Sequence, residues 1–115
     1  MVGFGEVNVM CVDLERSLGF YRDALGLAEV EREAGAVRLR LDPITVLLLP
    51  FAEATRAADR YGSEATISFD VVVDDVDATV AALEAAGGRR TGVIDDGAGW
   101  AVADPDGNII EVIGT

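Results

Sequence analysis

Residues 12–27 read VDLERSLGFYRDALGL, a stretch with the period of an amphipathic helix and a signal at each end. Asp13 can cap the first turn, because its carboxylate can accept a hydrogen bond from a free backbone N–H. Gly26 suits the left-handed position that closes the last turn. The apolar stripe between them consists of Leu14, Leu18, Tyr21 and Leu25. The spacing therefore predicts one helix here.

A strand precedes this helix, and three more are expected after it. Residues 6–12 alternate between polar and apolar positions, which is the period of a strand with one buried face. The expected strands after the helix cover about residues 28–33, 36–41 and 44–49. The first half of the chain is therefore predicted to be one βαβββ module.

The same order recurs in the second half at a constant offset of 62 residues, with Asp75 matching Asp13 and Asp104-Pro105 matching Asp42-Pro43. The expected elements are a strand at 67–73, a helix from Asp75 to Gly87, and strands at about 90–94, 99–103 and 108–113. The sequence predicts an α+β fold in which two tandem βαβββ modules form a curved eight-stranded cup. We expect one domain over residues 1–115, with module one at about 5–50, a linker at about 51–63 with a possible helical turn, and module two at about 64–115.

The composition limits the chemistry. The formal net charge is −12, which argues against a nucleic-acid partner and favours cationic ligands, although a generic acidic surface is the simpler explanation. The chain has no histidine and no lysine, and Cys11 is its single cysteine. We expect a buried, inert thiol there. No stretch approaches the length and apolarity of a membrane helix, so a cytoplasmic location without membrane contact is expected.

A duplicated module usually buries one ligand between its copies, so the sheet faces opposite the helices are the expected lining of the cup. Strand alternation assigns this lining to Glu6, Asn8, Met10, Arg38, Arg40, Leu47 and Leu49 from module one, and to Ser68, Asp70, Val72, Trp100, Val102, Ile109 and Glu111 from module two. The result is a mixed and partly charged pocket for a small molecule. Charged side chains on an enclosed face need a partner, so a ligand role is expected for some of them.

Three motifs resemble the vicinal oxygen chelate superfamily, which includes glyoxalase I, extradiol dioxygenases and bleomycin-resistance proteins. They are the helix of residues 12–27, Asp74-Asp75-Val76-Asp77-Ala78, and Asp104-Pro105-Asp106-Gly107-Asn108 leading to Glu111. The resemblance covers nearly the whole chain and implies the cup-shaped fold. It also implies a homodimer, because cups in this superfamily often form across a two-fold axis.

In metal-dependent members of this superfamily, a residue on the first strand and one on the fourth strand of each module hold a divalent ion. At the offset of 62 these positions are Glu6, Leu49, Ser68 and Glu111. Leucine cannot bind a metal, and no imidazole is present for a borderline ion. We therefore expect no metal and no other cofactor. A weak Mg or Mn site made by Glu6, Asp70, Glu111 and water is the alternative.

The missing ligands favour members that only bind, as bleomycin-resistance proteins do with a cationic, aromatic antibiotic. Trp100 would stack on the ligand, and Glu6, Asp70 and Glu111 would attract its charge. Trp100 can equally be a core aromatic, and the two arginines of the lining can simply neutralise the acids. The second hypothesis is an enzyme of the lyase, isomerase or dioxygenase kind, metal-independent or weakly dependent on Mg or Mn, with Glu6 and Glu111 as acid and base. The third is an accessory protein with a collapsed cup.

Overall fold

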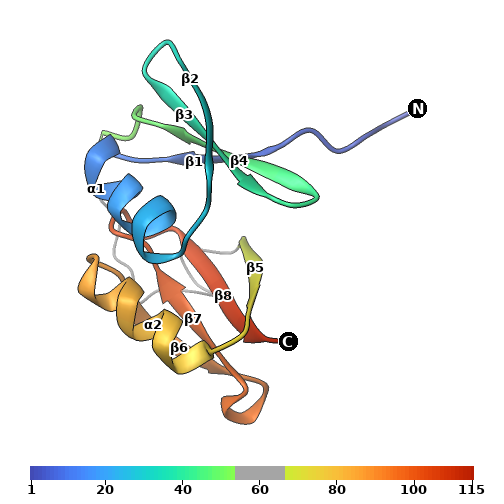
Figure 1. Cartoon of the computed structure of the whole chain (residues 1–115), viewed down its shortest axis with the longest axis vertical. Coiled ribbons are helices and arrows are strands. Elements are labelled where there is room, and N and C mark those ends of the chain that lie inside the picture. Colours follow the sequence, from blue (N-terminus) through green and yellow to red (C-terminus); the bar gives the residue numbers. More distant parts are fainter. Residues whose placement is uncertain (54–66) are drawn as a thin grey trace.

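The computed structural model describes residues 1–53 and 67–115 and confirms the α+β fold of two tandem βαβββ modules (Figure 1). Module one contains β1 (Val7–Met10), α1 (Leu14–Leu18), a π-helical turn η1 (Gly19–Ala24), β2 (Glu29–Glu33), β3 (Ala36–Leu41) and β4 (Ile44–Leu49). Module two contains β5 (Ser68–Val73), α2 (Val76–Ala85), β6 (Arg89–Ile94), the short helical turn η2 (Asp95–Gly97), β7 (Gly99–Ala103) and β8 (Ile109–Gly114). The predicted helical turn of the linker lies largely outside the described residues.

Each module forms its own four-stranded mixed sheet, ordered β1-β4-β3-β2 and β5-β8-β7-β6. The first and fourth strands of each module are parallel, and the other neighbours are antiparallel. The two sheets are not closed into one, and the helices of both modules lie on the same side of the molecule (Figure 1). The edge strand β2 is exposed and rich in charge, which protects it from pairing with another chain.

The predicted caps are present in both modules. The Asp13 carboxylate accepts from the backbone N–H of Arg16 at 3.2 Å, and that of Asp75 accepts from the N–H of Ala78 at 3.0 Å. Gly26 and Gly87 adopt the positive φ values that end each helical segment. The first helix differs from the prediction in one respect, because after Leu18 it widens into the π-helical turn.

One apolar core joins the helices of both modules to the covered faces of both sheets. It includes Leu18, Phe20 and Tyr21 from the first helical segment, with Leu83 from α2, all fully buried. The rings of Phe20 and Tyr21 meet edge to face, with centroids 4.8 Å apart. Cys11 is also buried, as predicted, and burial raises the pKa of its thiol. Within the described residues no helix is long and apolar enough to cross a membrane.

Equivalent strands of the two modules are not separated by one constant number of residues, which corrects the sequence prediction. Val7 pairs with Val46 and Phe69 pairs with Ile110, so the first strands are offset by 62 residues but the fourth strands by 64. Leu39 pairs with Val46 and Val102 pairs with Ile110, so the third strands are offset by 63. The position in module one that matches Glu111 is therefore Leu47 rather than Leu49.

The changed offset also moves Trp100 and Val102 to the other face of the sheet. A shift of one residue reverses the direction in which every side chain of a strand points. Val102 is buried in the core on the helix-covered face, and Trp100 packs against that core with the Arg90 guanidinium 4.7 Å from its ring centroid. Ala101 is the residue of β7 that lies opposite Glu111. The prediction that Trp100 and Val102 line the cup was wrong.

Candidate functional site

The sheet face opposite the helices in module one, called the open face below, carries a network around Arg38. The guanidinium of Arg38 donates to both oxygens of the Glu6 carboxylate, with Nε to Oε2 at 2.8 Å and Nη2 to Oε1 at 3.1 Å. It also donates to Glu31 through Nη1. The hydroxyl of Thr45 donates to Glu6 Oε2 at 2.8 Å. This geometry joins strands β2, β3 and β4 to the residue before β1.

These bonds determine the protonation of Glu6. The hydrogen bonds from Arg38 and then from Thr45 lower the pKa of the Glu6 carboxyl from 4.5 to about 2. The group is therefore a permanent anion at neutral pH. An acid that must release a proton near neutrality needs a raised pKa, so this arrangement does not serve the acid–base role expected of Glu6.

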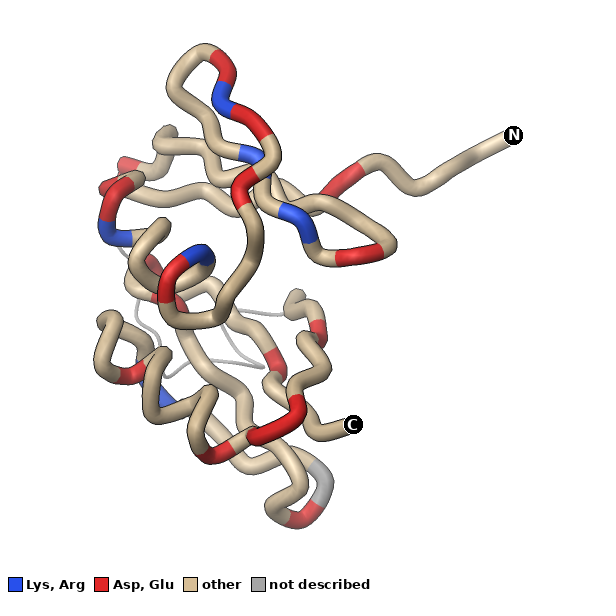
Figure 2. Tube along the Cα trace, in the orientation of Figure 1, with Lys and Arg blue, Asp and Glu red and all other residues tan. Residues whose placement is uncertain are grey.

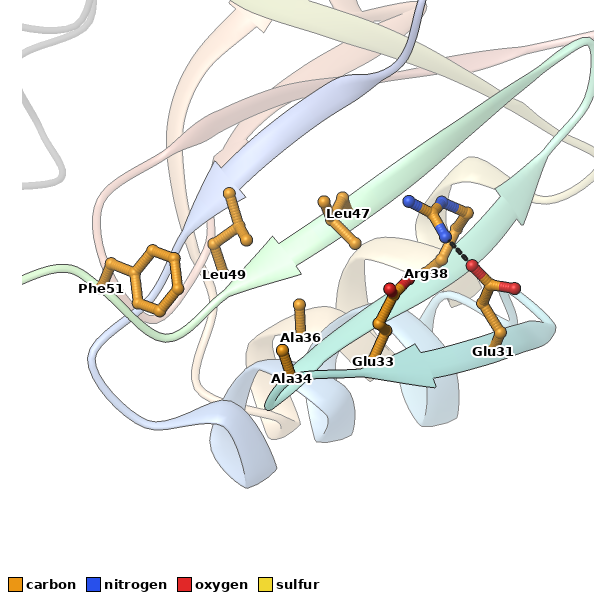
Figure 3. Close-up of a pocket in the computed structure, with 8 residues that line it drawn as sticks. All are labelled: Glu31, Glu33, Ala34, Ala36, Arg38, Leu47, Leu49 and Phe51. Atoms are coloured by element: carbon orange, nitrogen blue, oxygen red, sulfur yellow. Dashed lines mark hydrogen bonds and ion pairs between the residues drawn. The ribbon is translucent and has the colours of Figure 1, made fainter.

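A half-open pocket of about 200 Å³ lies on the open face beside this network (Figure 3). Strand β2 and the β2–β3 turn contribute Glu31, Glu33 and Ala34, and β3 contributes Ala36 and Arg38. Leu47 and Leu49 come from β4, and Phe51 follows that strand. The floor is apolar, one end is aromatic and the other end is charged (Figure 3).

Of the predicted site residues, Arg38 and Leu49 line this pocket, as does Leu47 from the predicted lining, whereas Glu31, Glu33, Ala34, Ala36 and Phe51 were missed. The positions of Glu31 and Glu33 could have been predicted from the sequence. Glu31 lies opposite Arg38 and Glu33 opposite Ala36 in the β2–β3 hairpin, so assigning its two-residue turn would have placed both on the open face. Phe51 could not be predicted in this way, because it falls in the stretch assigned to the linker.

The other predicted residues of module one lie on the same open face but outside the pocket. Asn8 lies opposite Leu47 and Met10 opposite Leu49 in the parallel ladder, and both are exposed. Arg40 lies opposite Thr45, with its guanidinium 3.9 Å from the Asp42 carboxylate. Figure 2 shows that the arginines of the described segments gather mainly in module one, while acidic residues are spread over both modules.

Module two brings a separate set of predicted residues together. The Ser68 hydroxyl donates to Glu111 Oε2 at 3.0 Å, and Asp70 lies opposite Glu111 in the parallel ladder. The partners of Glu6 come from module one, so the structure assigns the two glutamates to different clusters. Across residues 1–53 and 67–115, no group of three or more cysteine or acidic side chains is arranged to hold a metal ion.

Residues 6–113 match the sequence profile of the glyoxalase-like domain family. The chain belongs to this family. The match spans both modules, including the Glu6 network, the pocket and the Ser68–Glu111 pair. A search of curated proteins found none whose sequence matches this glyoxalase-like protein.

Solved structures with the same fold carry several functions. A glyoxalase-related enzyme from Fulvimarina pelagi is 24% identical, with a TM-score of 0.75, and the match covers 100% of this chain and 89% of that one. A lactoylglutathione lyase from Agrobacterium tumefaciens is 27% identical, with a TM-score of 0.64 and coverage of 97% and 92%. An antibiotic-binding protein from a Streptomyces species is 20% identical, with a TM-score of 0.66 and coverage of 98% and 96%. The fold of this glyoxalase-like protein is therefore compatible with both binding and catalysis.

Proposed function

We propose that this glyoxalase-like protein binds a small molecule with a cationic group and an apolar or aromatic body, and sequesters it without a metal. The observation that carries this proposal is the pocket on the open face of module one. Its apolar floor of Ala36, Leu47 and Leu49 runs from the Phe51 ring to the carboxylates of Glu31 and Glu33. Small-molecule sites have this composition, with a mainly apolar lining and a few polar groups that orient the ligand.

The local charge supports a cationic ligand. Three carboxylates, those of Glu6, Glu31 and Glu33, act on the Arg38 guanidinium. The next arginine on the open face, Arg40, lies beside a carboxylate of its own, that of Asp42. One positive charge cannot neutralise three negative charges, so the pocket keeps a negative potential that attracts a cation. Phe51, whose surface is 63% exposed, supplies the stacking face that the sequence had assigned to Trp100. The structural likeness to an antibiotic-binding protein agrees with this proposal.

Catalysis of a lyase, isomerase or dioxygenase reaction is the alternative, and it would centre on Glu111. The hydrogen bond from Ser68 and the neighbouring Asp70 make module two the place where such an activity would be sought. Elemental analysis after separate exposure to Mg, Mn, Fe, Ni and Zn, followed by dialysis, tests the metal-dependent form of this alternative, whereas a metal-independent enzyme would retain no metal either. Sequestration predicts less than about a tenth of an equivalent of metal. About one retained equivalent per chain, lost in Glu111→Gln, would favour the enzyme.

We also propose a cytoplasmic homodimer. The exposed edge strands β1 and β5 would be covered by a symmetric contact with a second copy. Light scattering should give about twice the chain mass of 12.1 kDa. A mass of one chain at micromolar concentration would contradict the dimer.

The binding proposal is tested with two dyes of similar shape and opposite charge, 10-methylacridinium and anthracene-9-carboxylate. Fluorescence titration should show saturable binding of the cation and at least about tenfold weaker binding of the anion, because the pocket is net negative. Phe51→Ala should weaken the cation about tenfold through loss of stacking. Phe4→Ala is the matched control, since Phe4 is an exposed phenylalanine outside the pocket. Equal binding of both dyes, or no binding, would overturn the proposal.

A further inference from the structure

The pocket is polarised along its length. The Phe51 ring lies at one end, and Arg38, Glu31 and Glu33 lie at the other (Figure 3). Leu49, Leu47 and Ala36 form the apolar stretch between the two ends (Figure 3). A ligand that fills this pocket therefore has an apolar ring at one end, a short aliphatic middle and a charged group at the other end.

The three carboxylates at the charged end are not equivalent. Glu6 accepts two hydrogen bonds from Arg38 and one from Thr45, and Glu31 accepts one from Arg38. Glu33 lines the pocket and attracts the Arg38 guanidinium through its charge, but within the described parts of the chain it makes no hydrogen bond or ion pair. Its carboxylate keeps its full capacity to accept hydrogen bonds. An ammonium group entering the pocket would therefore pair with Glu33, while Arg38 stays bound to its own partners.

The volume limits the size of the ligand. A pocket of about 200 Å³ is smaller than the ~300–1,000 Å³ typical of sites for drug-sized molecules. Its enclosed part holds one aromatic ring with a short chain, and a larger body, such as that of a three-ring dye, would extend through the open side. We infer that the enclosed part of the site recognises an arylalkylamine, with the ring stacked on Phe51 and the protonated amine paired with Glu33. This inference rests on the proposed function and assigns Glu33 as the residue that selects a cation.

Three probes of nearly equal size and shape test the inference: 2-phenylethylamine, 2-phenylethanol and 3-phenylpropanoate. They carry a positive, a neutral and a negative end at neutral pH. Titrations of ¹⁵N-labelled protein followed by NMR should give the tightest binding for the amine. The shifted amide signals should include those of Ala34, Ala36, Leu49 and Phe51, which locates the probe in the pocket.

Glu33→Gln should weaken binding of the amine about fivefold, the size expected for a partly solvated ion pair, and should leave the alcohol unchanged. Asp74→Asn is the matched control, because it removes one exposed carboxylate far from the pocket in the sequence and outside its lining. Phe51→Ala should weaken the amine and the alcohol alike. Glu33→Gln, Asp74→Asn and Phe51→Ala all change exposed side chains, so folding is expected to be retained and is checked by the same spectra.

The outcomes separate this inference from the proposed function. If 10-methylacridinium binds but the amine does not, or if the amine binds no better than the alcohol, the arylalkylamine inference is wrong and the broader binding function stands. If Glu33→Gln does not weaken the amine, Glu33 is not the selecting residue. If neither the amine nor 10-methylacridinium binds, the proposed function fails as well.

Discussion

At the scale of single residues, the Glu6 carboxylate shows how partners rather than residue type decide chemistry. The sequence offered Glu6 as an acid, a base or a weak metal ligand. In the structure its oxygens accept three hydrogen bonds, two of them from the Arg38 guanidinium. Charge-assisted bonds of this kind stabilise the anion. Glu6 therefore organises the charged end of the pocket and leaves Glu33 as the carboxylate open to a ligand.

The first prediction concerns the titration of Glu6. Its pKa in the folded protein is lowered from 4.5 to about 2, so its bonds contribute stability that is fully present above about pH 4.5 and is lost as the pH falls through about 2. A carboxyl-detected NMR titration should show Glu6 still ionised at pH 3.5. In Arg38→Gln the midpoint should return toward 4.5, because the main cause of the shift is gone. A midpoint near 4.5 in the unchanged protein would contradict the structure.

At the scale of elements, the sequence predicted the strands well because their alternation and turns are local signals. Strands β3 and β4 begin and end at the predicted residues. The register between the two modules was not predictable from matched motifs. The β2–β3 turn has two residues, whereas the β6–β7 connection has four, and the hairpin at Asp104 is longer than its counterpart at Asp42. Glu31 pairs with Arg38 and Gly92 pairs with Ala101, so the second strands are offset by 61 residues. The two extra residues of the β6–β7 connection raise the offset to 63 for the third strands, and the longer hairpin raises it to 64 for the fourth.

The same limit explains the incomplete prediction of the site. Arg38, Leu47 and Leu49 followed from alternation within single strands, and the structure places them in the pocket. Trp100 was also assigned by alternation, but the phase of alternation chosen for β7 was one residue out, so the prediction put Trp100 on the wrong face. Phe51 reaches the pocket only because of where the chain turns after β4, which no local pattern in the sequence encodes.

The second prediction concerns the connection between α2 and β6. A Cβ atom at Gly88 would lie 2.5 Å from the Phe20 ring and 2.8 Å from the Leu83 carbonyl oxygen. Gly88→Ala should therefore destabilise the protein by about 2 kcal/mol, the usual cost of overpacking a core. Gly92→Ala is the control in the adjacent strand, since nothing lies within 4 Å of its added Cβ. Urea denaturation measures both, and equal stability of the two variants would show that Gly88 does not pack closely against Phe20 and Leu83.

At the scale of the whole molecule, the hairpin loop of module two holds the two modules together. Asp106 accepts from the backbone N–H of Val12 at 3.1 Å and from the Arg16 guanidinium at 2.9 Å. Asp104 accepts from the Tyr21 hydroxyl at 2.7 Å. Both aspartates are buried, and these hydrogen bonds help to offset the hydration that their carboxylates lose. The Asp104–Asn108 motif, which predicted a turn from the sequence, therefore also joins module two to module one.

The third prediction is that the Tyr21–Asp104 bond stabilises both modules as one unit. Tyr21→Phe keeps the ring in the core but removes the donor to a buried carboxylate, so it should cost about 2 kcal/mol of unfolding free energy. Burial raises the pKa of Asp104, and the Tyr21 bond partly opposes that rise. Because the bond favours the ionised form, the cost of Tyr21→Phe should be greatest above the pKa of Asp104 and should shrink as the pH falls below it.

A double-mutant cycle of Tyr21→Phe with Asp104→Asn, measured by urea denaturation at neutral pH, isolates this bond. A coupling energy of about 1 kcal/mol or more, with one cooperative transition for both modules, is the expected result. Thr45→Val is the control, because it removes a hydroxyl that donates to a carboxylate within module one alone and so should show no coupling to Asp104→Asn. Additive effects of the Tyr21 and Asp104 changes would mean that core packing, rather than this bond, joins the modules.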